Sequence, residues 1–198
     1  MSNKLTESQI IQQAESLGIE PAALQAVIDV ECKGSGFNQD GTPVILFERH
    51  VMRQRLIANH SGNTYAADQM MAKRPDLCNK SAGGYGLYSQ QHAKLNDAAK
   101  YDRTSALESC SWGIGQVMGY HWQSLGYPSL QAFINAMYKD EASQLEAMCR
   151  FIKVNGLVNA LKNKDWKAFA RGYNGPAYAK NNYDVKLGNA YKLHSSHN

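Results

Sequence analysis

Apolar residues recur every three or four positions along most of the chain, which is the pattern of helices that bury one face. The first predicted helix begins at Thr6, which can form a capping box with Gln9, and stops at Gly18. A second starts at Pro21, a residue that the first helical position tolerates. The same pattern predicts further helices near 65–72, from 104 onward, and over 129–137, 140–154, 165–173 and 183–193.

Three segments depart from this pattern. Residues 43–49 (PVILFER) are rich in strand-forming residues and predict a short strand or a buried extended segment. Residues 59–92 are polar, and we expect a long irregular region around the 65–72 helix. The glycine-rich SWGIGQVMG at 111–119 predicts a helix start or a tight turn. The expected fold is therefore mainly α (α+β), a helical globular domain with a small β element after the second helix.

Composition narrows the class of protein. With 198 residues, 43% of them hydrophobic, the chain can bury one core but is short for two ordinary domains, so we expect a single domain over 1–198. The net charge is only 21 − 17 = +4 and there is no Lys/Arg run, which argues against a nucleic-acid partner. No apolar stretch is long enough to span a membrane, and the start MSNKLTESQI lacks the apolar core of a signal peptide.

The four cysteines are far apart and show no metal-ligand spacing with the histidines. We therefore expect reduced, mostly buried thiols, and neither a metal nor another cofactor. GxSxG and HExxH are absent, which weakens serine-hydrolase and metallopeptidase interpretations. No coiled-coil heptad is visible, so a monomer is expected.

Glu31 is the strongest candidate for chemistry. It continues the apolar stripe of Leu24, Val27 and Ile28 on the second predicted helix. Burial on that face and the negative end of the helix dipole should both raise its pKa. A glutamic acid that stays protonated near neutral pH can act as a general acid. The alternative is a structural carboxylate paired with a buried arginine or a backbone amide.

Glu48 follows the predicted strand, beside Arg49 and His50. Such a cluster could lie at the edge of a cleft, where a second carboxylate would suit glycoside hydrolysis. We favour the plainer interpretation, a structural ion pair of Glu48 with Arg49 or Arg53.

A polar turn at 111–116 and the helix end at 173–175 are weaker candidates. Glycines in the turn would let a polymer approach the backbone, and Ser111 and Gln116 can hydrogen-bond sugar hydroxyl or acetamido groups. A plain helix-entry turn and an ordinary Asn-Gly helix stop explain these residues equally well.

Taken in order, however, these segments resemble the peptidoglycan N-acetylmuramidase family found in phage endolysins. The matching stretches, between about Glu15 and Lys192, are LQAVIDVECKGSGF, GTPVILFERHVM, GGYG, SCSWGIGQVMGYHW, ASQLEAMCRFI and DWKAFARGYNGPAYAKNNYDVKLGNAY. The resemblance implies a lysozyme-like fold, peptidoglycan as the partner, and hydrolysis of the β-1,4 bond between N-acetylmuramic acid and N-acetylglucosamine during host lysis. We expect one catalytic domain, and the expected lack of a separate wall-binding module beside it is a departure from the family pattern that fits an endolysin for a thin Gram-negative wall.

The resemblance also assigns roles. Glu31 becomes the acid, with Glu48 and Tyr173 as the other catalytic candidates. The implied substrate-binding residues are His50, Ser111, Trp112, Gly113, Gln116 and Asn174. Cys32 is a departure, because many relatives carry Ser after the acid.

Two other functions stay open. One is a lytic transglycosylase that gives anhydro-muropeptides. The other is a non-catalytic peptidoglycan-binding module, whose aromatic residues would stack on sugars. Those residues are Trp112, Tyr120, Trp122 and Tyr173.

Residues 179–198 carry lysines that could contact an anionic outer membrane, although a docked surface helix is the favoured interpretation. Without a signal peptide, we expect the chain to stay in the host cytoplasm until it is released to the periplasm. Phage and bacterial origins both fit.

Overall fold

The computed structural model describes residues 4–32 and 34–196, which form a mainly helical fold with a small sheet. The helices are α1 (Glu7–Leu17), α2 (Pro21–Glu31), α3 (Arg49–Asn59), α4 (Tyr65–Lys73), α5 (Gln91–Ala99), α6 (Arg103–Glu108), α7 (Leu130–Lys139), α8 (Glu141–Val154), α9 (Val158–Lys162), α10 (Trp166–Asn174) and α11 (Tyr183–Ser195). The strands are β1 (Ile45–Phe47), β2 (Cys110–Trp112) and β3 (Val117–Met118). Single turns of 3₁₀ helix lie at Tyr88–Gln90, Gly119–His121 and Tyr178–Asn181. The predicted fold class, mainly α with a small β element, is confirmed.

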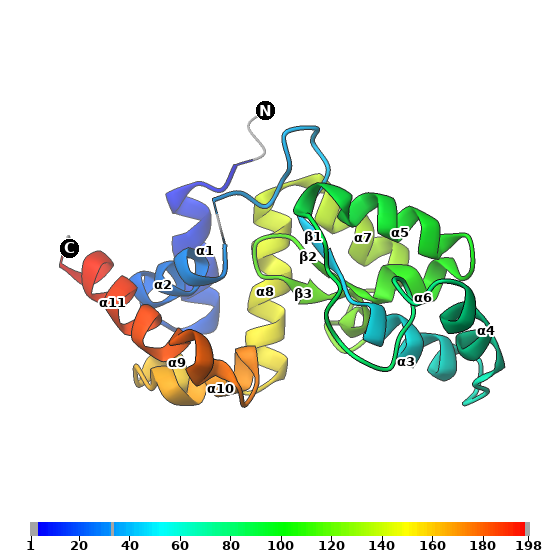
Figure 1. The fold of residues 1–198 in the computed structure, drawn as a ribbon. Coiled ribbons are helices and arrows are strands. Elements are labelled where there is room, and N and C mark those ends of the chain that lie inside the picture. Colours follow the sequence, from blue (N-terminus) through cyan, green and yellow to red (C-terminus); the bar gives the residue numbers. More distant parts are fainter. Residues whose placement is uncertain (1–3, 33, 197–198) are drawn as a thin grey trace.

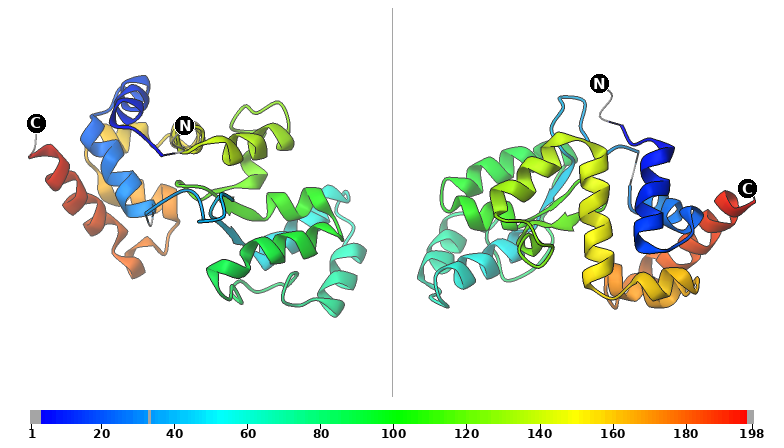
Figure 2. Two further views of the ribbon diagram at one scale, coloured as in Figure 1. Left: turned by 90° about the horizontal axis from the view of Figure 1, so that it is seen from above. Right: turned by 180° about the vertical axis from the view of Figure 1, so that it is seen from behind.

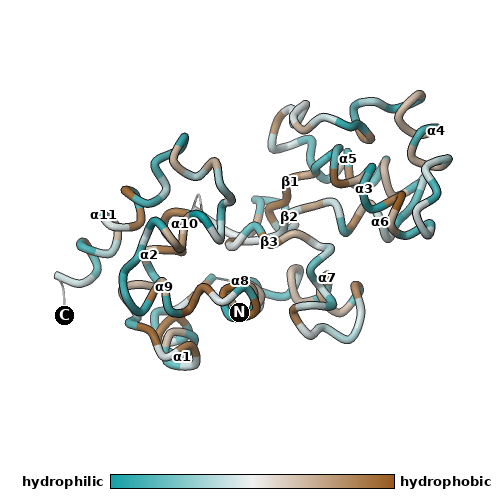
Figure 3. The backbone as a smooth tube through the Cα atoms, turned by 90° about the horizontal axis from the view of Figure 1, so that it is seen from below, coloured by the Kyte–Doolittle hydropathy of each residue, from teal (hydrophilic) through white to brown (hydrophobic). Residues whose placement is uncertain are grey.

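Helix α8 stands between two groups of elements (Figure 1). On one side lie α1, α2, α9, α10 and α11, and on the other lie the sheet and the helices α3 to α7. The views from above and behind show the same division (Figure 2), and in Figure 3 α8 is seen roughly end-on between the two groups. The chain crosses between the groups through the segment that joins α2 to β1.

The helix boundaries follow local capping chemistry. Thr6 and Gln9 form the predicted capping box, and Gly18 ends α1 in a left-handed conformation with φ 63°. The side chains of four further residues accept hydrogen bonds from backbone N–H groups at helix starts, which satisfies donors that have no partner inside the helix. They are Asp102 for α6, Ser129 for α7, Asp140 for α8 and Asp165 for α10.

The sheet corrects two sequence-based expectations. Of the two alternatives for residues 111–119, the helix start is wrong and the tight turn is confirmed, because β2 and β3 form an antiparallel hairpin that turns between Trp112 and Val117. β2 also pairs with β1, with Leu46 opposite Ser111, so the strand order is β1-β2-β3. The strand expected over 43–49 is shorter than predicted, because α3 begins at Arg49.

Three helices were not predicted: the short α9, which buries only Leu161, and the longer α3 and α5. α3 buries only Val51, Met52 and Leu56, and the strand-like run before it obscures its start. α5 begins at the end of the segment expected to be irregular, and it buries one leucine together with a glutamine and an alanine. Both therefore lack the wide apolar stripe on which the predictions rest.

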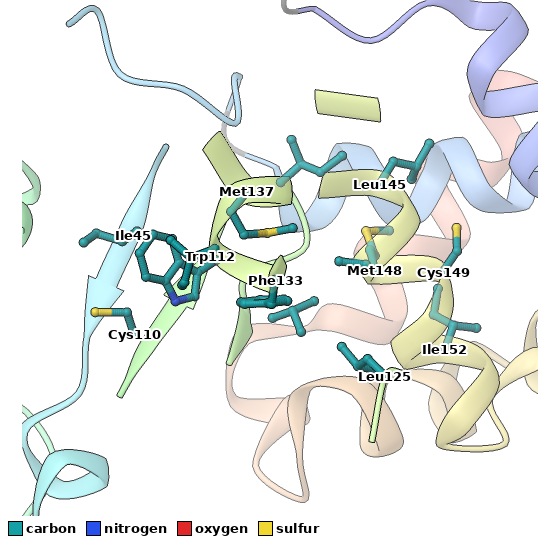
Figure 4. Packing of buried hydrophobic residues seen from close by; sticks show 14 of the residues in the cluster. Ile45, Cys110, Trp112, Leu125, Phe133, Met137, Leu145, Met148, Cys149 and Ile152 are labelled. Carbon is teal, nitrogen blue, oxygen red and sulfur yellow. The ribbon is translucent and has the colours of Figure 1, made fainter. Parts of the chain in front are cut away.

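A hydrophobic core runs through both groups of elements. α8 contributes the predicted buried face, Leu145, Met148, Cys149 and Ile152, and α7 adds Phe133 and Met137 (Figure 4). The side chains of β1 and β2 meet this layer at Ile45, Cys110 and Trp112 (Figure 4). α8 is thus the element on which both groups pack.

Two polar side chains of α8 are buried in the same place. Gln144, only 1% exposed, accepts a hydrogen bond from Ile114 N–H at 3.0 Å and donates to the carbonyls of Gly36 and Met137 at 3.2 and 2.9 Å. One turn earlier, Glu141 accepts from Gly36 N–H and from the Ser35 hydroxyl, both at 2.9 Å. α8 therefore fixes the segment after α2 and the β2–β3 turn at once.

α11 lies along α2, as a docked surface helix would. Leu187 is fully buried there, while Lys186 and Lys192 are exposed. The Tyr191 hydroxyl donates to Glu20 at 2.6 Å, and His194 lies 2.6 Å from Asp29. Residues 197–198 of the lysine-bearing segment lie outside the described residues. Within the part of the chain that the structure describes, no helix is long and apolar enough to cross a membrane.

We expect Gln144→Ala to lower the free energy of unfolding by about 3 kcal/mol, because it leaves one N–H and two C=O groups buried without that partner. Urea denaturation followed by circular dichroism measures the change. Gln12→Ala on the exposed side of α1 is the control and should change it by less than about 0.5 kcal/mol. Equal stability of the two variants would contradict the bridging role of Gln144.

Candidate active site

A hollow of about 260 Å³ opens between the end of α2 and the β2–β3 turn. Its lining residues are Glu31, Cys32, Ser35, Asn38, Val44, Tyr88, Gly113 and Gln116. Glu31 is the one carboxylate among them. The hollow therefore brings the strongest sequence candidate together with two residues of the polar turn.

Glu31 is the last residue of α2, and it meets the last residue of α10. The Asn174 side-chain amide donates a hydrogen bond to Glu31 Oε1 at 2.9 Å. Burial raises the pKa of the Glu31 carboxyl, while Asn174 and the positive charge of Lys186 act in the opposite direction. The direction agrees with the sequence argument, and the structure identifies desolvation as its main cause.

Tyr173 lies beside this pair and holds the turn. Its hydroxyl donates to the carbonyl oxygen of Gly115 at 2.7 Å, and its ring stacks on Phe169 with centroids 5.4 Å apart. Burial raises the pKa of Tyr173 well above its usual value, and electrostatic interactions with Glu31 and Cys149 add to this effect. The phenol is therefore a neutral donor.

The turn itself is held by its own polar side chains. The Ser111 hydroxyl donates to Gln116 Oε1 at 2.9 Å, and Gln116 Nε2 donates to the Gly113 carbonyl at 2.8 Å. Gly113 has φ 66°, and a Cβ atom there would lie 2.6 Å from the Gln144 side chain, so the position requires glycine. Gly113 and Gln116 line the hollow, whereas the buried Ser111 orients Gln116 from behind.

Trp112 does not lie where the sequence analysis expects it. Its side chain is 1% exposed and its indole N–H donates to the Leu107 carbonyl at 3.2 Å. Successive residues of a strand point to opposite faces, so Trp112 points into the core while Ser111 points toward the turn. Trp112 is therefore a core residue and does not contact a ligand in the hollow.

Glu48 pairs with His50, at 3.3 Å between Oε2 and Nδ1, and neither Arg49 nor Arg53 is its ion-pair partner among the described residues. Both of these atoms are buried and have no hydrogen-bond partner in the described part of the chain. The expected arginine pair is thus replaced by a Glu–His pair. Arg49 instead donates to backbone carbonyls of the 81–82 segment.

Strand alternation places Glu48 on the same face of the sheet as Leu46, the partner of Ser111. Ile45 and Phe47 occupy the opposite, core-facing side. Glu48 itself follows β1 as the N-cap of α3, and it does not line the hollow around Glu31.

Sequence reasoning missed Glu141 and Gln144, which hold the walls of the hollow. The signal was present, because both residues continue the apolar stripe of α8 just as Glu31 continues that of α2. The four cysteines are free thiols. In residues 4–32 and 34–196 no cluster of three His, Cys, Asp or Glu side chains could hold a metal ion.

Comparison with known proteins agrees with this architecture. The family model for N-acetylmuramidase matches residues 20–195. The crystal structure of the Burkholderia AP3 phage endolysin is similar, with a TM-score of 0.90 and 44% sequence identity over 99% of this chain and 73% of that chain. No curated protein matches. The fold is thus a lysozyme-like α+β fold, and the chain belongs to the N-acetylmuramidase family.

Proposed function

We propose that the protein is an endolysin that hydrolyses the β-1,4 bond between N-acetylmuramic acid and N-acetylglucosamine in bacterial peptidoglycan and so lyses the host cell. The observation that carries the proposal is the carboxyl of Glu31, which lines the hollow with a raised pKa beside Asn174. Membership of the N-acetylmuramidase family and the likeness to a phage endolysin support the substrate.

In the proposed reaction, the protonated Glu31 carboxyl gives its proton to the glycosidic oxygen as the bond from that oxygen to the sugar C1 breaks. Positive charge develops on the sugar ring, and a water molecule then adds to C1 and returns a proton to the enzyme. Asn174 orients the carboxyl through the 2.9 Å hydrogen bond. Tyr173 keeps Gly115 and the turn in place.

We assign the second carboxylate role to Glu48, which stabilises the developing charge directly or through a water molecule. Its place directly after β1, the strand that pairs with β2, supports this role, and His50 lies 3.3 Å from it. Glu31 is, however, the one carboxylate in the lining of the hollow. That observation favours the alternative of a lytic transglycosylase, in which the 6-hydroxyl of the sugar replaces water.

Glu31→Gln should lower the release of soluble muropeptides from purified peptidoglycan at least 100-fold, because the amide cannot donate the proton. Mass spectrometry of the released fragments measures this. Binding to insoluble peptidoglycan should persist. Glu15→Gln, an exposed carboxylate on α1, is the control and should keep full activity.

Wild-type products with reducing N-acetylmuramic acid ends would support the hydrolase. Products with anhydro ends would show instead that the protein is a lytic transglycosylase. Release of muropeptides by Glu31→Gln at the wild-type rate would contradict the assignment of Glu31 as the acid. If the wild type released no muropeptides, the non-catalytic peptidoglycan-binding module would be the remaining function.

Activity should fall as the pH rises through the raised pKa of Glu31, because the acid form is the active one. Lys186→Met removes a positive charge that favours the carboxylate, so the alkaline limb of kcat/KM should move to higher pH. Lys192→Met removes an equally exposed charge on the same helix that does not act on Glu31, so it should leave the limb in place. An unmoved limb in Lys186→Met, or equal shifts in both variants, would argue against this electrostatic coupling.

Glu48→Gln should lower kcat about 100-fold or more and leave the reducing-end products unchanged, because charge stabilisation is lost while Glu31 still donates its proton. Glu146→Gln, which breaks an exposed ion pair with Arg150, is the matched control. A Glu48→Gln enzyme with more than half of the wild-type kcat would show that Glu48 has only a structural role.

A further inference from the structure

The GGYG stretch at 83–86 lies in the irregular segment between α4 and α5. Gly83, Gly84 and Gly86 all have positive φ angles, between 67° and 90°. L side chains rarely adopt such backbone, so the stretch takes a loop shape that glycine allows. Tyr85 is therefore the one residue of this loop that presents a side chain.

A buried glutamine ties the loop to the sheet. The Gln91 side chain, which is 1% exposed, accepts a hydrogen bond from the Phe47 N–H at 2.9 Å. Its amide donates to the carbonyls of Tyr85 and Leu87 at 2.8 and 3.0 Å. Phe47 is the last residue of β1. Gln91 thus holds the loop at the point of the chain directly before Glu48.

Two cations hold the same loop. Lys94 Nζ donates to the carbonyls of Gly84 and Tyr85 at 2.6 and 2.9 Å. Arg49 donates to the two carbonyls of the 81–82 segment, and a Cβ atom at Gly84 would lie 2.8 Å from its guanidinium. The loop therefore packs against the residue that directly follows Glu48. Together with Gln91, these contacts fix the backbone on both sides of Tyr85.

This anchoring brings the Tyr85 side chain to Glu48. Burial raises the pKa of Tyr85, and the charge of Glu48 and a hydrogen bond between the two side chains add to this effect. The phenol is therefore a neutral donor at pH 7. Glu48 Oε2 faces His50 Nδ1 at 3.3 Å but accepts no hydrogen bond from a described residue. The Tyr85 hydroxyl is thus the group that can fix the direction of the carboxylate.

The same loop reaches the Glu31 hollow. Tyr88, three residues after Tyr85, lines that hollow and is 63% exposed. The Cα atoms of residues three apart are separated by at most about 11 Å. One short segment therefore contacts Glu48 at Tyr85 and forms part of the Glu31 hollow at Tyr88.

We infer that Tyr85 is a positioning residue, whose hydroxyl holds the Glu48 carboxylate in the orientation that the reaction requires. The inference rests on the proposed function and on the role assigned there to Glu48. A carboxylate stabilises a developing positive charge best when it is already oriented toward it, so a carboxylate that rotates freely would do so less well. Tyr85 itself does not line the Glu31 hollow, and it acts through Glu48.

Tyr85→Phe removes the hydroxyl and keeps the ring. We expect the kcat for release of muropeptides from purified peptidoglycan to fall about tenfold, because a hydrogen bond to a charged group is lost. KM should stay within about twofold, since glycan binding is untouched. Tyr101→Phe, at a tyrosine that is 48% exposed after α5, is the matched control and should keep the wild-type kcat. Circular dichroism establishes that each variant is folded.

A double-mutant cycle separates positioning from a merely structural role. In the Glu48→Gln background, Tyr85→Phe should change kcat by less than about twofold, because the carboxylate that it positions is already gone. A loss of about tenfold in both backgrounds would overturn the inference. So would a Tyr85→Phe enzyme with the wild-type kcat, or a Glu48→Gln enzyme that keeps more than half of it.

A second measurement does not depend on activity. The ¹³C shift of Cζ-labelled tyrosines follows the ionisation of Tyr85, whose signal is assigned by its loss in Tyr85→Phe. The titration of Tyr85 should move to lower pH in Glu48→Gln, because a negative charge that disfavours the phenolate is removed. It should stay in place in Glu146→Gln, which changes an exposed carboxylate on α8.

An unmoved Tyr85 titration in Glu48→Gln would overturn the contact between the two side chains. Failure of the proposed function looks different, because the wild-type protein would then release no fragments from peptidoglycan while the Tyr85 titration would still shift.

Discussion

The buried amide of Gln144 is the interaction on which the rest of the site depends. It joins the β2–β3 turn at Ile114, the segment after α2 at Gly36 and the end of α7 at Met137. Glu141, one turn away on α8, adds two hydrogen bonds to the same segment after α2. A buried polar group costs free energy unless it is fully paired, so α8 admits few other placements of these walls. One helix thus sets where the Glu31 hollow opens.

The hydrogen bonds of Gln144 and Glu141 hold the walls around the Glu31 carboxyl, which is buried in a place that disfavours its charged form. Burial raises the pKa of Glu31, which means that the folded protein is less stable with Glu31 ionised than it would be with the carboxylate in water. Asn174 and Lys186 offset only part of this effect. The end of α2 therefore holds a buried carboxyl at a cost in stability, and the proposed role as proton donor would account for that cost. The core around α8 supplies the stability that the site lacks (Figure 4).

The features that the sequence predicts correctly are those that depend on neighbouring residues along the chain. Capping residues such as Thr6 and Asp140 mark real helix starts, and the carboxylate at position 31 continues a buried stripe. The pairing of the 111–118 hairpin with β1 was not predictable in this way, because it joins segments far apart in the sequence. The same limit explains Trp112, whose direction depends on that register. Glu48 is different, because its partner His50 is close to it along the chain. Gln144 stands out as a polar residue within the apolar stripe of α8. Periodicity does not reveal, however, which residues far along the chain it binds by hydrogen bonds.

The central claim is that burial in the hollow raises the pKa of Glu31, and a direct titration of its carboxyl tests it best. The measurement is the ¹³C chemical shift of labelled glutamate carboxyls as a function of pH, with the Glu31 signal assigned by its loss in Glu31→Gln. The account predicts that this carboxyl titrates above the ordinary value of 4.5. A Glu31 carboxyl that titrates at or below the ordinary value would contradict it.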